Sequence, residues 1–244
     1  MKTIVIIPSR LSATRLPNKP LLKINDVSII SHVFKRAEEA NIGEVIVATE
    51  DQEIIDDVKK NGGNAILTSR NHKTGTDRIF EAFSLLNLKN VDFIMNIQGD
   101  EPQIDMKDII NLNNKMTINQ SKIGTLAAKI SKIDIFKNEH VVKVKINQSF
   151  EKESFPEAEL FTRKTNDKKN IFHHIGIYCY EKDTLKNFVS LKQSQNEIKN
   201  KLEQLRALDN GIKINVAHAQ SSPIGVDTKE DFLALKKIME YKSK

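Results

Sequence analysis

A basic loop, residues 8–20, is the first part of the chain whose residue types could do chemistry. It holds Arg10, Arg15 and Lys19 but no acidic residue. Guanidinium and ammonium groups gathered in this way can donate charge-assisted hydrogen bonds to phosphate oxygens. The loop contains no glycine, so it is neither a Walker loop nor a dinucleotide-binding fingerprint. Taken alone, it is more simply explained as a solvated basic turn.

Two carboxylates in other parts of the chain could hold a metal ion. Asp100 comes directly after an apolar run, and Gly99 relieves the steric crowding beside it. Asp227 precedes an expected helix, where Thr228 and Asp231 could form a capping pair. Carboxylate oxygens at such positions are natural ligands for Mg²⁺. The alternative for each aspartate is a structural role in a turn or a helix cap.

A third group of candidates lies on the predicted strand Ile171–Tyr180, whose residues separate into two faces by their period of two. The face that includes His173 is expected to be core. The opposite face presents His174 and Tyr178, and Gly176 between them leaves space for a ligand. A histidine with structural partners is the alternative, and we prefer it for His173.

The elements that must position these residues alternate between strand and helix through the first half of the chain. The predicted strands are Thr3–Ile7, Glu44–Thr49, Ala65–Thr68 and Asp92–Ile97. The helices between them carry apolar stripes, including Ile29, Val33 and Ala37 on the first. Asp51 is expected to cap the second helix, and Thr76 and Asp77 to start the third. This alternation predicts an α/β fold with a mostly parallel central sheet flanked by helices. Ligands bind such sheets at the carboxyl ends of the strands, where residues 8–20 and Asp100 fall.

The second half of the chain has mixed signals. The predicted strands are Thr125–Ile130, Val141–Ile146, Ile171–Tyr180 and Lys213–Ala219, and the predicted helices are Lys182–Ser190, Glu197–Leu208 and Thr228–Tyr241. Residues 147–170 are polar and poorly periodic, which is compatible with a lid, a subunit contact or a surface insertion. Because no long linker marks a boundary, we expect residues 1–244 to form a single domain, with a lid or dimerisation insertion around 131–170.

The composition excludes several classes of protein. The 38 Lys and Arg against 32 Asp and Glu give a formal charge of +6, but the excess is mostly scattered lysine. With only 11 Phe and 3 Tyr for stacking, this charge indicates a solvated surface and not a nucleic-acid interface. Cys179 is the single cysteine, which excludes an internal disulfide. The absence of a long apolar run argues against a membrane span, and we expect a cytoplasmic protein.

Seven motifs, taken together, identify a family. They are residues 7–10, 14–21, 75–78, 96–102, 174–178, 202–206 and 225–228. In this order they resemble the 3-deoxy-manno-octulosonate cytidylyltransferase family, also called CMP-Kdo synthetases, over nearly the whole chain. The resemblance implies a glycosyltransferase-A-like nucleotidyltransferase fold with a smaller inserted sheet or dimerisation region. It also implies an Mg²⁺-dependent homodimer that joins CTP and 3-deoxy-D-manno-octulosonate (Kdo) into CMP-Kdo and pyrophosphate, which activates the sugar for lipopolysaccharide biosynthesis.

The resemblance also implies roles for individual residues. The catalytic residues would be Arg10, Lys19, Asp100 and Asp227, of which Asp100 and Asp227 would hold Mg²⁺. The nucleotide-binding residues would be Pro8, Ser9, Arg10, Arg15, Lys19, Ser69, Thr74 and Arg78. The sugar-binding residues would be Gln98, Arg163, His174, Tyr178, Glu203 and Gln204.

Three departures from the family pattern affect the expected sugar site. Residues 164–167 after Arg163 lack the usual pattern, His173 stands where arginine is frequent, and Ser194-Gln195 replaces a usual Ser-Pro. The acceptor could therefore be 8-amino-Kdo or another α-keto acid sugar. A non-catalytic CTP-binding regulator is the alternative from another class of protein.

Overall fold

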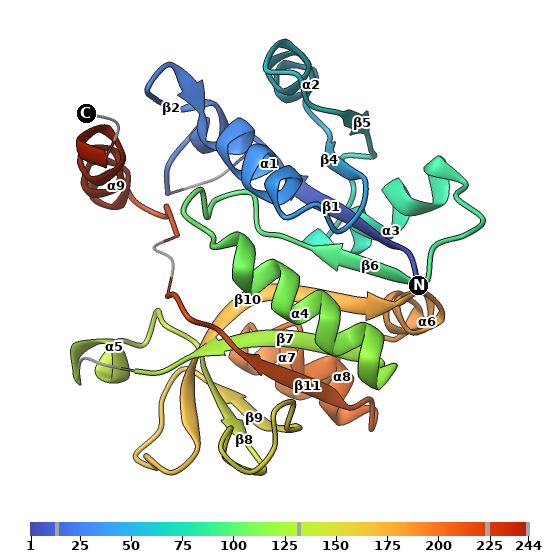
Figure 1. Cartoon of the computed structure of the whole chain (residues 1–244), viewed down its shortest axis with the longest axis vertical. Coiled ribbons are helices and arrows are strands. Elements are labelled where there is room, and N and C mark those ends of the chain that lie inside the picture. Colours follow the sequence, from blue (N-terminus) through green and yellow to red (C-terminus); the bar gives the residue numbers. More distant parts are fainter. Residues whose placement is uncertain (13–14, 131–132, 223–224, 243–244) are drawn as a thin grey trace. The chain divides into compact units, whose positions relative to one another are not determined.

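The computed structural model describes the whole chain except residues 13–14, 131–132, 223–224 and 243–244 (Figure 1). It divides into two compact units. The N-terminal unit comprises Lys2–Val91, Met95–Met106 and Pro223–Lys244. The central unit comprises Met1, Asp92–Ile94 and Lys107–Ser222, and it contains the described part of the expected insertion, whose residues 131–132 lie outside the description.

The N-terminal unit is built on parallel strands. Strand β1 pairs with β4, and β4 pairs with β5, in each case in parallel. Strand β6 follows as the neighbour of β1, and its last two residues belong to this unit. The bounds of these strands are Thr3–Ser9 for β1, Val45–Thr49 for β4, Ala65–Leu67 for β5 and Phe93–Asn96 for β6. The predicted α/β class and its mostly parallel sheet flanked by helices are therefore confirmed.

Three helices pack against these strands because each carries an apolar stripe. They are α1 (Ile29–Glu39), α2 (Gln52–Lys60) and α3 (Gly75–Leu86). All the apolar residues expected on the first stripe, including Val33 and Ala37, are buried. The remaining elements of the unit are the 3₁₀ helix η1 (Lys19–Leu21), the hairpin strands β2 (Lys23–Ile24) and β3 (Val27–Ser28), and α9 (Lys229–Lys242).

Two predicted helix starts need correction. Asp51 occupies the N-cap position of α2, but its side chain makes no capping hydrogen bond. Its Oδ2 accepts a hydrogen bond from the Leu11 backbone N–H at 2.7 Å instead. Helix α3 begins at Gly75, one residue earlier than expected, because Thr74 is the N-cap residue and forms a reciprocal capping box with Asp77.

The central unit has a mixed sheet. Strand β10 pairs antiparallel with β7 and β8, β8 pairs antiparallel with β9, and β11 pairs in parallel with β7. The strands are β7 (Ile123–Ala128), β8 (Lys143–Ile146), β9 (Ala158–Thr162), β10 (Ile171–Glu181) and β11 (Ile214–His218). The helices are α4 (Met106–Asn119), of which Met106 lies in the N-terminal unit, α5 (Ile133–Lys137), α6 (Lys182–Ser190), α7 (Gln195–Asn200) and α8 (Leu205–Asp209).

Several elements of this unit differ from the prediction. The expected helix Glu197–Leu208 is two helices, because Lys201 adopts a left-handed φ of 53° that ends α7. Strand β9 lies inside the polar segment 147–170, which had no predicted strand. Helix α4 also escaped prediction, because its sequence is rich in asparagine, a weak helix former.

Strand β10 contains a bulge and buries a different set of side chains from the predicted one. Its register against β7 shifts between Ile175 and Tyr178, so the simple alternation of faces fails there. His174 is buried, whereas His173 is only partly buried and its Nδ1 lies 2.6 Å from the Ser222 hydroxyl. The expectation that His173 belongs to the core face is therefore wrong.

Across the residues described, no helix has the length and apolar character that crossing a membrane requires.

A buried ion pair holds the turn before α8. Arg206 donates from Nε and Nη2 to the two carboxylate oxygens of Glu197 at 2.9 and 2.6 Å, and its guanidinium lies 4.7 Å from the centroid of the Phe188 ring. Both charged side chains are only 4% exposed. Burial alone would raise the pKa of Glu197, but hydrogen bonds from Arg206 and Gln193 lower it overall. The pair thus fixes the backbone that carries residues 203 and 204.

We predict that Arg206→Met lowers the free energy of unfolding by about 3–5 kcal/mol, because it leaves a buried carboxylate without its partner. Urea unfolding followed by circular dichroism measures this loss. Lys213→Met is the matched control, since Lys213 pairs with Glu157 on the surface, and it should leave the unfolding midpoint nearly unchanged. The loss should shrink in acid, as pH falls from the ordinary glutamate range through the lowered pKa of Glu197, where the parent carboxylate takes up a proton. An Arg206 variant as stable as the parent would contradict this role.

Candidate active site

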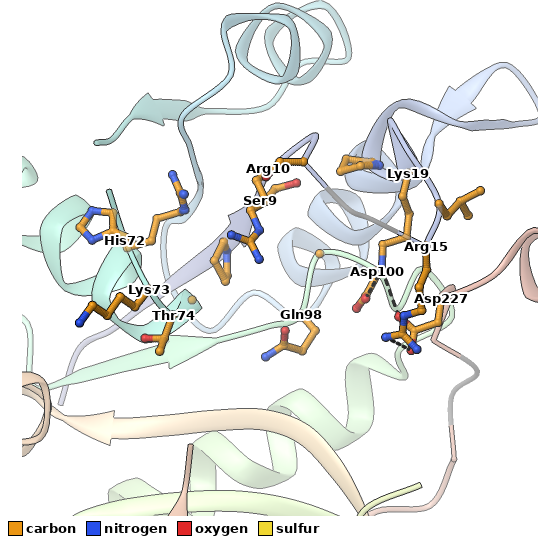
Figure 2. A pocket seen from close by; sticks show the side chains of 17 residues that line it. Ser9, Arg10, Arg15, Lys19, His72, Lys73, Thr74, Gln98, Asp100 and Asp227 are labelled. Atoms are coloured by element: carbon orange, nitrogen blue, oxygen red, sulfur yellow. Dashed lines mark hydrogen bonds and ion pairs between the residues drawn. The ribbon is translucent and has the colours of Figure 1, made fainter. Parts of the chain in front are cut away.

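The N-terminal unit contains a cavity of about 400 Å³ at the carboxyl ends of β1 and β6. Its wall brings together ten of the residues selected from the sequence (Figure 2). These are Pro8, Ser9, Arg10, Arg15, Lys19, Thr74, Arg78, Gln98, Asp100 and Asp227. The loops after two neighbouring parallel strands therefore meet at one site, as expected for an α/β sheet.

Gly99 allows the loops after β1 and β6 to approach each other. A Cβ atom at this position would lie 3.0 Å from the Pro8 carbonyl oxygen and 3.1 Å from the Ile30 side chain. Backbone and packed core could not move aside easily, so a larger residue would push the two loops apart. The predicted role of Gly99 in relieving crowding next to Asp100 is confirmed.

Lys19 lies between the two predicted metal ligands. Its ammonium group is 2.7 Å from Asp100 Oδ2 and 3.5 Å from Asp227 Oδ1 (Figure 2). The Lys19 side chain is 14% exposed, so these contacts are poorly screened by water. Arg15 also contacts Asp227, at 3.1 Å, but it is 61% exposed and this pair contributes little to stability. One cation thus holds two carboxylates together.

Asp227 is positioned by its neighbours in the chain. The Val226 backbone N–H donates to the Asp100 carbonyl oxygen at 3.0 Å. The Val226 side chain is fully buried in a cluster with Ile24, Ile29 and Leu235 of α9, against which Leu16 of the basic loop also packs. This apolar cluster places the basic loop and Asp227 at the same edge of the cavity.

Sequence reasoning missed three acidic residues around the cavity. Asp51 anchors the basic loop through the Leu11 N–H, and the Glu50 carboxylate pairs with the guanidinium of Arg78. Glu101 has a buried Oε2 atom that finds no hydrogen-bond partner among the residues described, and burial together with the charge of Asp100 raises its pKa to about 8. Asp51 and Glu50 follow the carboxyl end of β4, so the rule that located Asp100 could have found them as well.

The central unit gathers three of the predicted sugar-binding residues. The His174 and Tyr178 rings lie 5.4 Å apart, and the charge of Glu203 is one cause of the raised pKa of Tyr178, after burial and Tyr180. Burial, with a smaller contribution from His173, lowers the pKa of His174 to about 3, so its imidazole is neutral.

The hydrogen bonds of Thr125 identify the tautomer of His174. The Thr125 hydroxyl donates to the Ile177 carbonyl oxygen at 2.7 Å, and the His174 Nε2 atom lies 3.0 Å from the same hydroxyl oxygen. Since the hydroxyl has one proton, Nε2 of His174 must carry the hydrogen and donate it. The remaining ring nitrogen, Nδ1, is then an acceptor.

Three other residues that were predicted to bind substrate do not line the cavity. Arg163 donates to the backbone carbonyl oxygens of Glu139 and His140, at 3.4 and 3.1 Å. Gln204 is the N-cap residue of α8 without a side-chain capping bond. Ser69 does not line the cavity, although it lies in the segment that leads to Thr74.

A parallel α/β sheet with a basic cavity and two facing carboxylates fits a nucleotidyltransferase, and the family match below shows that class. The sequence profile of the family described as cytidylyltransferase matches residues 4–214. The chain belongs to this cytidylyltransferase family, and within it to the 3-deoxy-manno-octulosonate cytidylyltransferases. The predicted family, fold and enzyme class are confirmed.

Two curated relatives and one solved structure illustrate the similarity. The 3-deoxy-manno-octulosonate cytidylyltransferase of Thermodesulfovibrio yellowstonii is 41% identical over 98% of each chain. The protein of the same name from Afipia carboxidovorans is 41% identical over 97% of this chain and 96% of its own. A solved structure of CMP:2-keto-3-deoxy-manno-octonic acid synthetase complexed with CTP has a TM-score of 0.89 at 33% identity, over 99% of this chain and 100% of that one.

Proposed function

We propose that this protein joins CTP and Kdo to give CMP-Kdo and pyrophosphate, which activates the sugar for lipopolysaccharide biosynthesis. The observation that carries the proposal is the Lys19 ammonium held between Asp100 and Asp227 inside a basic cavity. Relatives of this name match nearly the whole chain at about 41% identity, and a solved relative binds CTP.

The reaction requires stabilisation of charge on the triphosphate. A sugar hydroxyl oxygen attacks the α-phosphorus of CTP and loses its proton, the α–β bridging bond breaks, and pyrophosphate leaves. Arg10, Arg15 and Lys19 are the cations of the basic loop that would bind the phosphate oxygens and stabilise the departing pyrophosphate. Lys19 would exchange its contacts with Asp100 and Asp227 for phosphate oxygens when CTP and Mg²⁺ bind.

The carboxylate pair fits Mg²⁺, which proteins usually hold with one or two carboxylates together with substrate phosphates. Asp100 and Asp227 supply two such groups on one side of the cavity. In the part of the chain that the structure describes, no cluster of three or more His, Cys, Asp or Glu side chains could hold a metal ion. Bound Mg²⁺ would offset the triphosphate charge and lower the pKa of the attacking hydroxyl.

The proposed sugar-binding residues differ in how directly the geometry supports them. Gln98 lines the nucleotide cavity. His174 is neutral, so it would act as a hydrogen-bonding group and not as a cation for the sugar carboxylate. Arg163 would have to leave its backbone acceptors to meet the sugar, and Gln204 follows from the family motif alone. We further propose a homodimer, which also rests on the family resemblance alone.

We predict that purified protein supplied with CTP, Kdo and Mg²⁺ releases one pyrophosphate for each CMP-Kdo formed. A coupled pyrophosphate assay with the product mass measures both. Turnover of 8-amino-Kdo in preference to Kdo in a competition experiment would reassign the acceptor. Binding of CTP without turnover of either sugar would contradict the proposed activity and support a nucleotide-binding regulator.

We predict that Asp100→Asn lowers kcat by about 100-fold or more, because it removes one carboxylate from Lys19 and from the proposed metal site. The isosteric change should leave the thermal unfolding midpoint close to that of the parent. Asp56→Asn is the matched control, since Asp56 is exposed on α2, away from the cavity lining, and accepts a hydrogen bond from Gln52. An Asp100 variant that turns over at the parent rate would refute the role.

A further inference from the structure

Residues 72–74 form part of the cavity wall away from the carboxylate pair, and residues 69–71 lead into them. Figure 2 shows His72, Lys73 and Thr74 at one end, and Lys19 and Asp227 at the other. If the triphosphate binds at the Lys19 end, as the proposed function requires, the nucleoside extends toward residues 69–74. The conformation of this segment then determines how the nucleotide base binds.

Helix α3 holds this segment from one face. Residues 74, 77, 78 and 81 share that face because they are three or four positions apart. Arg78 donates to the Thr68 hydroxyl at 2.6 Å and to the Ser69 carbonyl oxygen at 3.3 Å. Thr74 closes the segment as the N-cap of the helix.

Glu81 completes the anchorage, although it does not line the cavity. Its Oε2 accepts the Ser69 backbone N–H at 2.8 Å and also contacts Nε2 of His72. The Ser69 hydroxyl in turn accepts the Asn71 backbone N–H at 3.2 Å. One carboxylate oxygen therefore joins the beginning of the segment to His72, whose side chain lies on the cavity wall.

We propose that Glu81 is a positioning residue that sets nucleotide selectivity, by holding residues 69–74 in the shape that receives cytosine. Cytosine and uracil present opposite hydrogen-bonding groups at two ring positions, so distinguishing them requires donors and acceptors held in place. Burial raises the pKa of Glu81, but the contacts with His72 and Ser69 lower it overall, which keeps the carboxylate charged. The inference rests on the proposed function, because it assumes that the cavity binds a nucleoside triphosphate.

The test compares Glu81→Ala with the parent in calorimetric titrations of CTP, UTP and inorganic tripolyphosphate. We expect CTP affinity to fall about tenfold, a loss of about 1.4 kcal/mol, and the preference for CTP over UTP to decrease. Tripolyphosphate affinity should stay within about twofold, because this probe reports the phosphate end alone. In the full reaction, KM for CTP should rise while kcat changes little.

Two further variants separate positioning from a general loss of structure. Glu81→Gln keeps one carbonyl acceptor and should recover part of the CTP affinity. Glu39→Ala is the matched control, since Glu39 pairs with Arg36 on the exposed face of α1, and it should change none of the affinities.

Three results would overturn the inference. They are unchanged CTP affinity and selectivity in Glu81→Ala, an equal loss of tripolyphosphate binding, and a fall in kcat without a change in KM. Parent protein that binds tripolyphosphate but neither nucleotide would overturn the proposed function as well, so the two failures can be distinguished.

Discussion

The arrangement of Lys19 between Asp100 and Asp227 is the constraint on which the rest of the cavity depends. Two carboxylates facing the same cavity repel each other, and a cation between them offsets this repulsion. The local fold maintains the arrangement: Gly99 lets two loops approach, and Val226 ties the segment before Asp227 to the Asp100 backbone. The same two carboxylates are the groups that we propose to hold Mg²⁺ beside the triphosphate.

Much of this organisation could be predicted from the sequence because it follows from local patterns. The stripe on α1 and the apolar run of β1 have single periodicities, and both were located correctly. The basic loop and Asp100 were recognisable because they follow parallel strands, whose carboxyl ends meet at one edge. Asp227 is already a candidate in its segment 225–228, where helix capping explains Thr228 better than Asp227, and the family motifs add the expected metal-binding role.

Other features depend on contacts that no local pattern records. Asp51 resembles a helix cap in sequence, yet its carboxylate anchors Leu11, forty positions away. His173 lies outside the core although the alternation of β10 places it there, and its imidazole pairs with the Ser222 hydroxyl, 49 positions away. In the sequence Glu81 has no feature that sets it apart from other helix residues, and only the folded segment 69–74 reveals its contacts with Ser69 and His72. Long-range hydrogen bonds therefore account for most of what the sequence could not predict.

We propose that the carboxylate pair and Lys19 form a joint site for CTP and Mg²⁺. The most direct measurement is the calorimetric affinity of the parent protein for CTP, in the absence of sugar, over a series of Mg²⁺ concentrations. We expect Mg²⁺ to tighten CTP binding by about tenfold or more, because it offsets repulsion between the triphosphate and the two aspartates. CTP affinity that stays the same or weakens as Mg²⁺ is added would contradict it.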